Sequence, residues 1–569
     1  MIEKQWIPIE TDEAAVRDLQ NALKINPIFC QLLVQRGIKT YDEAKLFFRP
    51  KLEHLHDPFL MKNMETAVLR LEKAIKHKER ILLYGDYDVD GTTSVALMYT
   101  FLKKHHTSSL DYYIPHRYKE GYGISYQGID FAVEHDYSLV IAMDCGIKAI
   151  DKIAYAKSKN IDFIICDHHL PEEKVPDAVA VLDPKQSDCP YPYKELSGCG
   201  VAFKLVQAYV EKNDFPFTEV TDLLDLLTVS IACDIVPITG ENRVLAYYGL
   251  QRLNKNPRLG LRTLIATANR SYPLSISDVV FGLGPMINAA GRISDAKEAV
   301  RLLLSQDKNK AKENAEKLRH ENIKRKAFEQ LITTAATQKI TANPDWHTRK
   351  TIVLYNEDWH KGVLGIVASR MVETFHRPTV ILAKSEDKIV GSARSVMGFD
   401  IHDALKSCED LFINFGGHQY AAGLTINAAN LTAFQERFET IVAQRITAEQ
   451  LTPKVKVHAS INFEQLSPKF WNILKQFAPF GPGNRRPVFS TANVINTGQS
   501  RLLKEKHIKL KIQQASVSAT AVQNAIAFNF ADYFPYIRDK KSFQMCYAIE
   551  ENTWQGTKSL QLNVKDIKI

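Results

Sequence analysis

The sequence lacks the features that mark disulfide-bonded, zinc-stabilised and membrane-spanning proteins. Its 569 residues include only 8 cysteines, and none forms a C-x-x-C pair, which argues against a structural zinc site. No run of about 18 apolar residues occurs, so no membrane span is expected. The first residues, MIEKQWIPIETDEAAV, contain no apolar signal core. We therefore expect a cytoplasmic protein in a reducing compartment, with no membrane partner.

Composition and charge exclude little else. Hydrophobic residues make up 45% and charged residues 24%, as in an ordinary globular protein. The net charge of +8 is a mild excess that fits a polyanionic partner and also fits a slightly basic surface. At roughly 100–200 residues per domain, the length predicts about three to five domains. There is no internal repeat and no low-complexity tract.

The spacing of apolar residues divides the chain into five parts. Residues 1–75 show helical spacing and are predicted as an N-terminal helical segment. Residues 76–240 alternate short apolar runs with helical stretches, which predicts a catalytic α/β domain with a parallel sheet. The rest is predicted as a helical connector at 241–345, a second α/β domain at 346–448 and an OB-type β barrel at 449–569.

Two basic stretches each leave two interpretations open. In the connector, the stretch from 307 to 340 mixes many lysines with Glu313, Glu316 and Glu321, which favours a solvated helix over a face that contacts nucleic acid. In the predicted barrel, basic side chains lie in or beside strands. They are Arg501, Lys504, Lys506, Lys509 and Lys511. Such residues suit the phosphates of a single strand, and they also suit the protection of an edge strand.

Acidic and histidine side chains follow three predicted strands and one further apolar stretch of the first α/β domain. They are Asp86, Asp88, Asp90, Asp144, Asp167, His168, His169 and Asp234. A single aspartate at such a place is usually a turn or cap residue. Because sites form at the carboxyl ends of strands in an open α/β sheet, we expect this whole set to gather at one edge. Gathered carboxylates repel and raise one another's pKa, and a cation resolves that conflict.

This set predicts a two-metal phosphodiester hydrolase. Two metal ions about 3.5–4 Å apart supply hydroxide near neutral pH and neutralise phosphoryl charge. Asp144, from a central strand, is the predicted bridge between the ions. The predicted metal ligands are Asp86, Asp88, Asp90, Asp144, His168 and Asp234. Imidazole among carboxylates shifts the preference from Mg²⁺ toward Mn²⁺, so two Mn²⁺ ions are expected first and Mg²⁺ second.

Several motifs resemble those of a known family. The four motifs of the DHH phosphoesterase superfamily are matched by YGDYDVDGTTS (84–94), AMDCGI (142–147), CDHHLP (166–171) and ACDIVP (232–237). Four further segments resemble the RecJ branch of this superfamily: SGCGVAFKL (197–205), GSARS (391–395), FGGHQYAAG (415–423) and FAPFGPGNRRPVF (477–489). The resemblance covers nearly the whole chain. It implies an exonuclease that degrades single-stranded DNA 5′ to 3′ to mononucleotides, in DNA repair and recombination.

The resemblance also implies roles at the metal site. Asp88 and Asp90 would each hold one metal ion, and Asp144 would bridge the two. His168 and Asp234 would complete the ligand set. The residues expected to be catalytic are His169, which would lie closer to the scissile phosphate, Asp144, and Asp167, which would orient a histidine.

Substrate contacts are implied in the same way. Arg117, Ser392 and Arg394 would gather around a terminal 5′ phosphate, since arginine suits bidentate phosphate contacts. Asn288, Arg292 and His418 would contact the strand. Met286 stands where the family usually has a basic residue, which leaves one strand contact open. From the residues alone, Arg117 could instead cap a strand and pair with Glu120.

Two other functions compete with this interpretation. A small-substrate DHH phosphodiesterase would cleave short oligonucleotides or cyclic dinucleotides, but those enzymes resemble the two α/β domains without the connector and barrel. A scaffold that keeps the fold without catalysis would have lost metal ligands, and here every motif acid and both histidines are present. The implied partners are single-stranded DNA, single-strand-binding protein and a helicase, and we expect a monomer.

Overall fold

The computed structural model describes residues 3–515, 522–554 and 557–569, and it contains two compact units. One unit comprises Arg49–Ala327 and Ala478–Arg485. The other comprises Met1–Phe48, Phe328–Phe477 and Arg486–Ile569. The chain therefore changes unit near residue 48, inside the part that we expected as a single helical segment up to residue 75.

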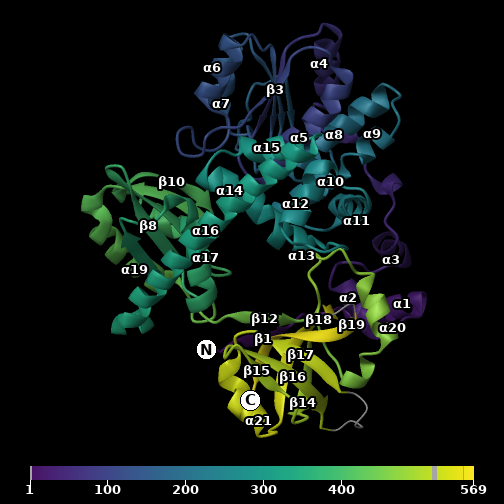
Figure 1. Cartoon of the computed structure of the whole chain (residues 1–569), viewed down its shortest axis with the longest axis vertical. Coiled ribbons are helices and arrows are strands. Elements are labelled where there is room, and N and C mark those ends of the chain that lie inside the picture. Colours follow the sequence, from purple (N-terminus) through teal and green to yellow (C-terminus); the bar gives the residue numbers. More distant parts are fainter. Residues whose placement is uncertain (1–2, 516–521, 555–556) are drawn as a thin grey trace. The chain divides into compact units, whose positions relative to one another are not determined.

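The first unit is built on a parallel sheet, as the sequence predicted (Figure 1). The sheet has five strands. Its strands are β2 (Ile81–Gly85), β3 (Leu110–Tyr113), β4 (Leu139–Met143), β5 (Asp162–Cys166) and β6 (Ala180–Leu182). Their order is β3-β2-β4-β5-β6, and every neighbouring pair is parallel. The strands β2 and β4 are buried along their whole length, because helices cover both faces of the sheet.

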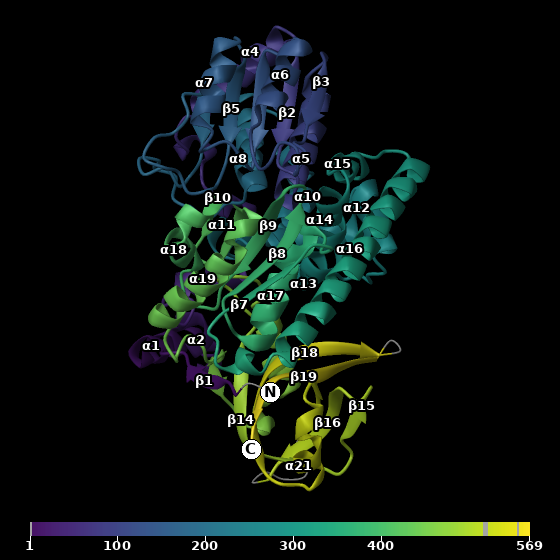
Figure 2. The ribbon, with the colours of Figure 1, turned by 90° about the vertical axis from the view of Figure 1, so that its left-hand side faces the viewer.

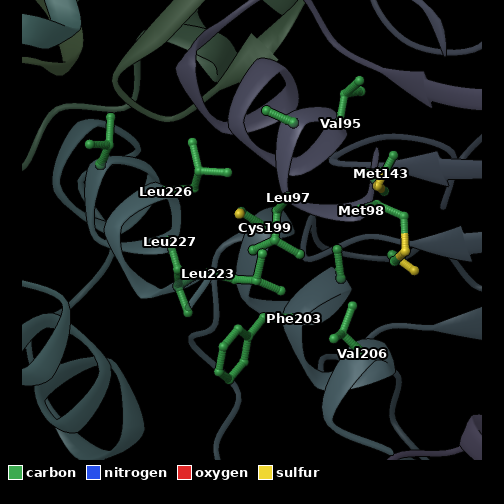
Figure 3. Packing of buried hydrophobic residues seen from close by; sticks show 14 of the residues in the cluster. Val95, Leu97, Met98, Met143, Cys199, Phe203, Val206, Leu223, Leu226 and Leu227 are labelled. Atoms are coloured by element: carbon green, nitrogen blue, oxygen red, sulfur yellow. The ribbon is translucent and has the colours of Figure 1, made fainter. Parts of the chain in front are cut away.

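Alternate residues of each strand face opposite helical layers. Leu83 and Ile141 belong to a core shared with α4 (Met64–Lys76), α5 (Val89–His105) and α8 (Gly198–Lys212). Leu82 and Val140 belong to a second core shared with α6 (Tyr126–Glu134) and α7 (Ile150–Ser158). Figure 3 shows the first core, where side chains of α5, α8 and the following helical part interdigitate. This packing fixes the helices whose first turns approach the strand ends.

A series of helices follows α8, and the last of them, α16 (Lys308–Ala342), continues past the end of this unit at Ala327. The series comprises α9 (Thr218–Thr221), α10 (Leu224–Cys233), α11 (Gly240–Lys255), α12 (Leu259–Thr267), α13 (Ile276–Asp278), the π-helical η3 (Val279–Leu283), α14 (Gly284–Ile293), α15 (Lys297–Leu303) and α16. Ion pairs within α16, such as Lys317 with Glu313, fit the solvated interpretation. Arg325 does not fit the solvated interpretation, because it is only 8% exposed.

The second unit contains the second α/β domain (Figure 2). Its strands are β7 (Ile352–Asn356), β8 (Thr379–Ser385), β9 (Lys388–Arg394), β10 (Phe412–His418) and β11 (Ala421–Ile426), in the order β10-β11-β9-β8-β7. Only β7 and β8 pair in parallel, so this sheet is mixed. One face packs on α17 (Leu364–Phe375), and the other packs on α18 (Ile401–Lys406) and α19 (Leu431–Arg445).

The C-terminal part of the same unit is the expected OB-type barrel. Its strands β14 (Val488–Asn496), β18 (Phe543–Trp554), β19 (Thr557–Lys568), β17 (Gln523–Ala527) and β16 (His507–Gln514) pair in that order. Pairing of β16 back onto β14 closes the barrel. The short β13 (Ala459–Ser460) and β15 (Arg501–Leu503) extend it, and α20 (Pro468–Lys475) and α21 (Phe534–Arg538) flank it.

The N-terminal residues belong to the same unit as the barrel. The strand β1 (Gln5–Pro8) pairs in parallel with β12 (Lys454–Val457), and the Trp6 indole donates to Asp566 over 2.7 Å. The helices α1 (Glu13–Leu23), α2 (Pro27–Val34) and α3 (Tyr41–Phe48) follow. Phe29 of α2 packs on Phe470 with ring centres 4.7 Å apart. These long-range contacts explain why residues up to 48 group with the C-terminal part.

Among residues 3–515, 522–554 and 557–569, no helix combines the length and the apolar character that crossing a membrane requires.

Candidate metal centre

The acids and histidines singled out in the first α/β domain do meet at the carboxyl end of its sheet. The Nε2 atom of His168 lies 3.3 Å from Asp144 Oδ1, 3.6 Å from Asp234 Oδ2 and 3.9 Å from Asp90 Oδ2. Two overlapping groups have ligand atoms within 4.8 Å of one another. They are Asp90, His168 and Asp234, and Asp144, His168 and His169. The two groups share His168, so their ligand atoms form one continuous cluster.

The first turn of α5 places two of the carboxylates. Asp88 is the N-cap residue, and its Oδ1 accepts a hydrogen bond from the Gly91 N–H over 3.1 Å. Asp90 lies in the first turn and accepts from the backbone N–H groups of Gly198 and Cys199 over 2.6 and 2.9 Å. The cap interpretation and the metal interpretation are therefore compatible, since Asp88 caps its helix with one oxygen.

The N-terminus of α8 and a serine of α10 hold Asp90 in place, and sequence reasoning assigned them no role. The Ser230 hydroxyl donates to Asp90 Oδ1 over 2.6 Å, and it lies 2.7 Å from the Ser197 hydroxyl. Ser197 caps α8 by accepting from the Gly200 N–H. The signal in the sequence was Ser197 followed three residues later by Gly200 at the start of a helix, but nothing local connects it to Asp90.

Asp144 is held where a side chain on α8 would not fit. A Cβ at Gly198 would lie 2.6 Å from the Asp144 Cβ, so only glycine allows this close approach. Asp144 itself has φ 60, in the left-handed region, directly after β4. The backbone at the end of the central strand is thus fixed by its neighbours.

Burial and mutual repulsion oppose ionisation of the carboxyl groups. Burial first, and then neighbouring carboxylates, raise the pKa of Asp86, Asp88, Asp144 and Asp234. Among the described residues, Asp86 Oδ1, Asp234 Oδ2 and both ring nitrogens of His168 are buried without a hydrogen-bond partner. Buried, unpartnered oxygen and nitrogen donors beside crowded acids fit a divalent cation such as Mn²⁺ or Mg²⁺.

The two histidines have opposite electrostatic surroundings. Burial lowers the pKa of His168, which favours the neutral ring that can bind a metal. Burial alone would lower the pKa of His169, but the hydrogen bond from its Nδ1 to Asp167 over 2.7 Å and the charges of Asp167, Asp90 and Asp88 together raise it. Burial opposes ionisation of Asp167, yet His169 and the Ile147 N–H lower the pKa of Asp167 to about 2. Asp167 therefore stabilises a protonated His169.

Aromatic side chains surround His169 and Arg117. The Arg117 guanidinium lies 4.7 Å from the centre of the Tyr87 ring, while Glu120 accepts from Tyr113 and Ser125. The Tyr122 hydroxyl donates to the Asp144 carbonyl over 3.1 Å and lies 3.1 Å from His169 Nε2. Neither tyrosine was singled out from the sequence, because tyrosine in a polar loop carries no recognisable pattern.

The helix α14 carries two of the predicted strand contacts. Asn288 and Arg292 are both partly exposed, and the Arg292 carbonyl accepts from the Tyr118 hydroxyl over 2.7 Å. This bond ties the end of α14 to the loop that contains Arg117. Met286 is 3% exposed, so the position that lacks the family's basic residue lies in the core.

The remaining predicted contacts, Ser392, Arg394 and His418, belong to the other unit. Ala421 of β11 pairs with both Arg394 of β9 and His418 of β10, so the three residues form one row across the sheet. Directly paired residues point to the same face, as do residues two apart along a strand. Ser392, Arg394 and His418 therefore share one face, and Arg394 Nη1 donates to Ser392 Oγ over 3.0 Å.

The raised carboxyl pKa values predict an unusual pH dependence for the metal-free protein. Because its pKa is raised, Asp144 keeps its proton to a higher pH in the folded chain than in the unfolded chain. Its contribution to the free energy of unfolding is therefore complete below about pH 4 and is lost as pH rises through the folded-state pKa. In urea unfolding with EDTA, wild type should lose stability relative to Asp144→Asn as pH rises. Parallel curves for the two proteins would contradict the raised pKa.

Comparison with known proteins agrees with these features. Residues 80–231 match the DHH family, N-terminal domain, residues 348–444 match the DHHA1 domain, and residues 457–566 match the RecJ OB domain. The single-stranded-DNA-specific exonuclease RecJ of Bacillus subtilis is 35% identical over 99% of this chain and 71% of its own length. The single-stranded-DNA-specific exonuclease RecJ of Haemophilus influenzae is 33% identical over 96% of this chain and 97% of its own length. The chain belongs to the RecJ family.

A solved structure of the RecJ family extends the likeness to the whole architecture. The crystal structure of RecJ in complex with Mn²⁺ from Thermus thermophilus has a TM-score of 0.84 and 27% sequence identity, over 99% of this chain and 79% of that one. The α/β fold with a parallel-sheet DHH domain, a DHHA1 domain and a C-terminal OB barrel, predicted from the sequence, is confirmed.

Proposed function

We propose that this protein is a metal-dependent exonuclease that degrades single-stranded DNA 5′ to 3′ to mononucleotides, in DNA repair and recombination. The observation that carries the proposal is the buried cluster around His168. Among the described residues its ring nitrogens have no hydrogen-bond partner, while three carboxylates lie within 4 Å of Nε2. Membership of the RecJ family, whose relatives are named for this activity, supports the choice of substrate.

Each residue of the centre has a proposed role. Two Mn²⁺ or Mg²⁺ ions would be held by Asp86, Asp88, Asp90, Asp144, His168 and Asp234, and would supply Lewis acidity and a hydroxide near neutral pH. Ser230 and the N-terminus of α8 keep Asp90 aimed at this site. His169, held protonated by Asp167, would donate a hydrogen bond to the reacting phosphate and give its proton to the oxygen that leaves the phosphorus.

The end of the DNA strand would be recognised by side chains outside the metal centre. We propose that Arg117, Ser392 and Arg394 bind the terminal 5′ phosphate and that His418 assists them. The shared face of Ser392, Arg394 and His418 supports this, because it presents a guanidinium, a hydroxyl and an imidazole together. Asn288 and Arg292 on α14 would contact the following nucleotides.

Digestion of an end-labelled single strand tests substrate and polarity together. With Mn²⁺, a 5′ label should appear first as mononucleotide, a matched duplex should resist, and removal of the 5′ phosphate should slow the reaction. Arg394→Ala should lose this phosphate preference by about tenfold or more, since a charged hydrogen bond contributes about 1.5–3 kcal/mol. Arg370 is an exposed arginine of α17 that pairs with Glu373, so Arg370→Ala should retain the preference for a 5′ phosphate.

Other outcomes would replace parts of the proposal. Equal shortening from both ends would contradict the role of Arg117 and Arg394. Rates that fall steeply as nucleotides are added would favour the small-substrate phosphodiesterase instead. Single-strand-binding protein and a helicase are proposed as partners of a monomeric, cytoplasmic enzyme, and a pull-down with each purified partner would test this.

A further inference from the structure

One segment of the chain has no role in the chemistry proposed above. Residues Ala478–Arg485 lie between α20 and β14, yet they belong to the unit that contains the metal centre, while Phe477 and Arg486 on either side belong to the other unit. These residues form most of the sequence motif FAPFGPGNRRPVF. The chain thus leaves the barrel part for eight residues and returns to it, which a simple linker would not need to do.

The segment docks on the residues that follow Asp234. The backbone N–H of Ile238 donates to the Pro482 carbonyl over 2.7 Å, and Ile238 is 0% exposed. A Cβ at Gly481 would lie 2.4 Å from Ile238 Cγ1, so the two segments are in close contact. The Arg243 guanidinium of α11 donates to the carbonyls of Ala478 and Pro479 over 3.0 and 3.4 Å.

The docked segment is braced internally. Gly481 and Asn484 exchange backbone hydrogen bonds of 3.0 and 3.1 Å. The Asn484 amide, which is buried, donates to the Pro479 carbonyl over 2.8 Å. A loop with its backbone groups bonded in this way resists deformation, so it can hold a neighbouring segment in place.

The segment that it holds contains backbone strain next to a proposed metal ligand. Asp234 is the C-cap residue of α10, and Ile235, the next residue, has φ 63 and is largely exposed. A β-branched residue in the left-handed region is strained and persists only where its surroundings fix it. On the far side of this turn, the Pro237 carbonyl accepts from Tyr193 and Asn242, and the N–H of Ile238 is bound to the docked segment.

We propose that Ala478–Arg485 is a positioning segment for Asp234. By holding Ile238, it fixes the strained turn at Ile235 and so keeps the Asp234 carboxylate aimed at His168, whose Nε2 is 3.6 Å from Asp234 Oδ2. The inference rests on the proposed function in one respect, the assignment of Asp234 as a metal ligand. It means that the C-terminal part of the chain supplies a piece of the catalytic unit on which metal affinity depends.

Mn²⁺ binding to the metal-free, full-length protein tests the inference without any turnover. Free Mn²⁺ would be measured by electron paramagnetic resonance during titration of wild type, Arg243→Gln and Arg252→Gln. Arg243→Gln should weaken binding by about 10- to 100-fold, the usual effect of residues that orient metal ligands. Arg252 lies on the same helix but pairs with Asp222 over 2.9 Å, so Arg252→Gln should bind Mn²⁺ as wild type does. Arg243→Lys should recover part of the affinity.

A double-mutant cycle with Asp234→Asn separates the possible failures. If the segment acts through Asp234, Arg243→Gln should add little to the loss already caused by Asp234→Asn. Unchanged Mn²⁺ affinity in Asp234→Asn would overturn the ligand assignment of the proposed function. Additive losses, or an Arg243→Gln protein that unfolds more easily but binds Mn²⁺ normally, would overturn the positioning role.

A second variant gives the same test if Arg243→Gln does not fold. Gly481→Ala removes no hydrogen bond but presses its Cβ on Ile238. It should also weaken Mn²⁺ binding by about tenfold while the circular dichroism spectrum stays that of wild type. Wild-type affinity in a folded Gly481→Ala protein would contradict the proposal.

Discussion

Asp144→Asn is expected to lower kcat by at least about 10³-fold, which corresponds to about 4 kcal/mol of transition-state stabilisation. The Asp144 carboxylate lies 3.3 Å from His168 Nε2 and is buried between strands whose ends carry the other acids. An amide keeps the shape of the side chain but removes the charge that would balance two cations. Release of nucleotides from single-stranded DNA with Mn²⁺ present measures the loss.

The fold should survive this substitution. Neutralising one member of a crowded set of carboxyls relieves repulsion, so metal-free Asp144→Asn should unfold at a urea concentration no lower than wild type. Asp151→Asn, at an exposed position in the first turn of α7, is the matched control and should keep wild-type activity. Near-normal nuclease activity in purified Asp144→Asn would rule out the proposed centre.

His169→Gln is expected to lower kcat by about 10²- to 10⁴-fold, the range typical of general acid–base groups. We assign His169 a role apart from the metal ligands because its pKa is raised, as suits a proton donor held by Asp167. Mn²⁺ affinity should therefore change much less than kcat. A large loss of Mn²⁺ affinity would show instead that His169 is a ligand, as its place beside Asp144 and His168 would allow.

The pH profile distinguishes a proton donor from a structural group. If His169 acts in its protonated form, kcat falls as pH rises through the pKa of His169. Asp167 raises that pKa, so Asp167→Asn should move the fall in kcat to lower pH. If Asp167→Asn lowers kcat equally at every pH and leaves the fall at the same pH, the role of the Asp167–His169 pair would be contradicted.

The metal centre could be predicted because parallel strands bring their carboxyl ends together. Asp86, Asp144 and Asp167 follow three neighbouring strands, so the alternation of strands and helices was enough to gather them. The residues that hold the ligands could not be found in this way. Ser230 reaches Asp90 from 140 positions away, and its helix shows only an apolar pattern around it.

Other features escaped prediction because long-range packing decided them. The strand β1 has only four residues, Gln5–Pro8, and exists because β12 pairs with it far along the chain. The burial of Arg325 and Met286 depends on what packs against their helices, which no spacing of charges reveals. The docking of Ala478–Arg485 beside Ile238 is likewise invisible in a motif of glycines and prolines that reads as a loop.

Counting the Mn²⁺ ions bound by the metal-free protein tests the central claim most directly. The account predicts about two ions per wild-type chain, bound with loss of protons because the carboxyls of the cluster have raised pKa values. Asp144→Asn should bind fewer ions or bind them far more weakly. A wild-type chain that binds no Mn²⁺, or an Asp144→Asn chain that binds it as wild type does, would contradict a metal centre at these strand ends.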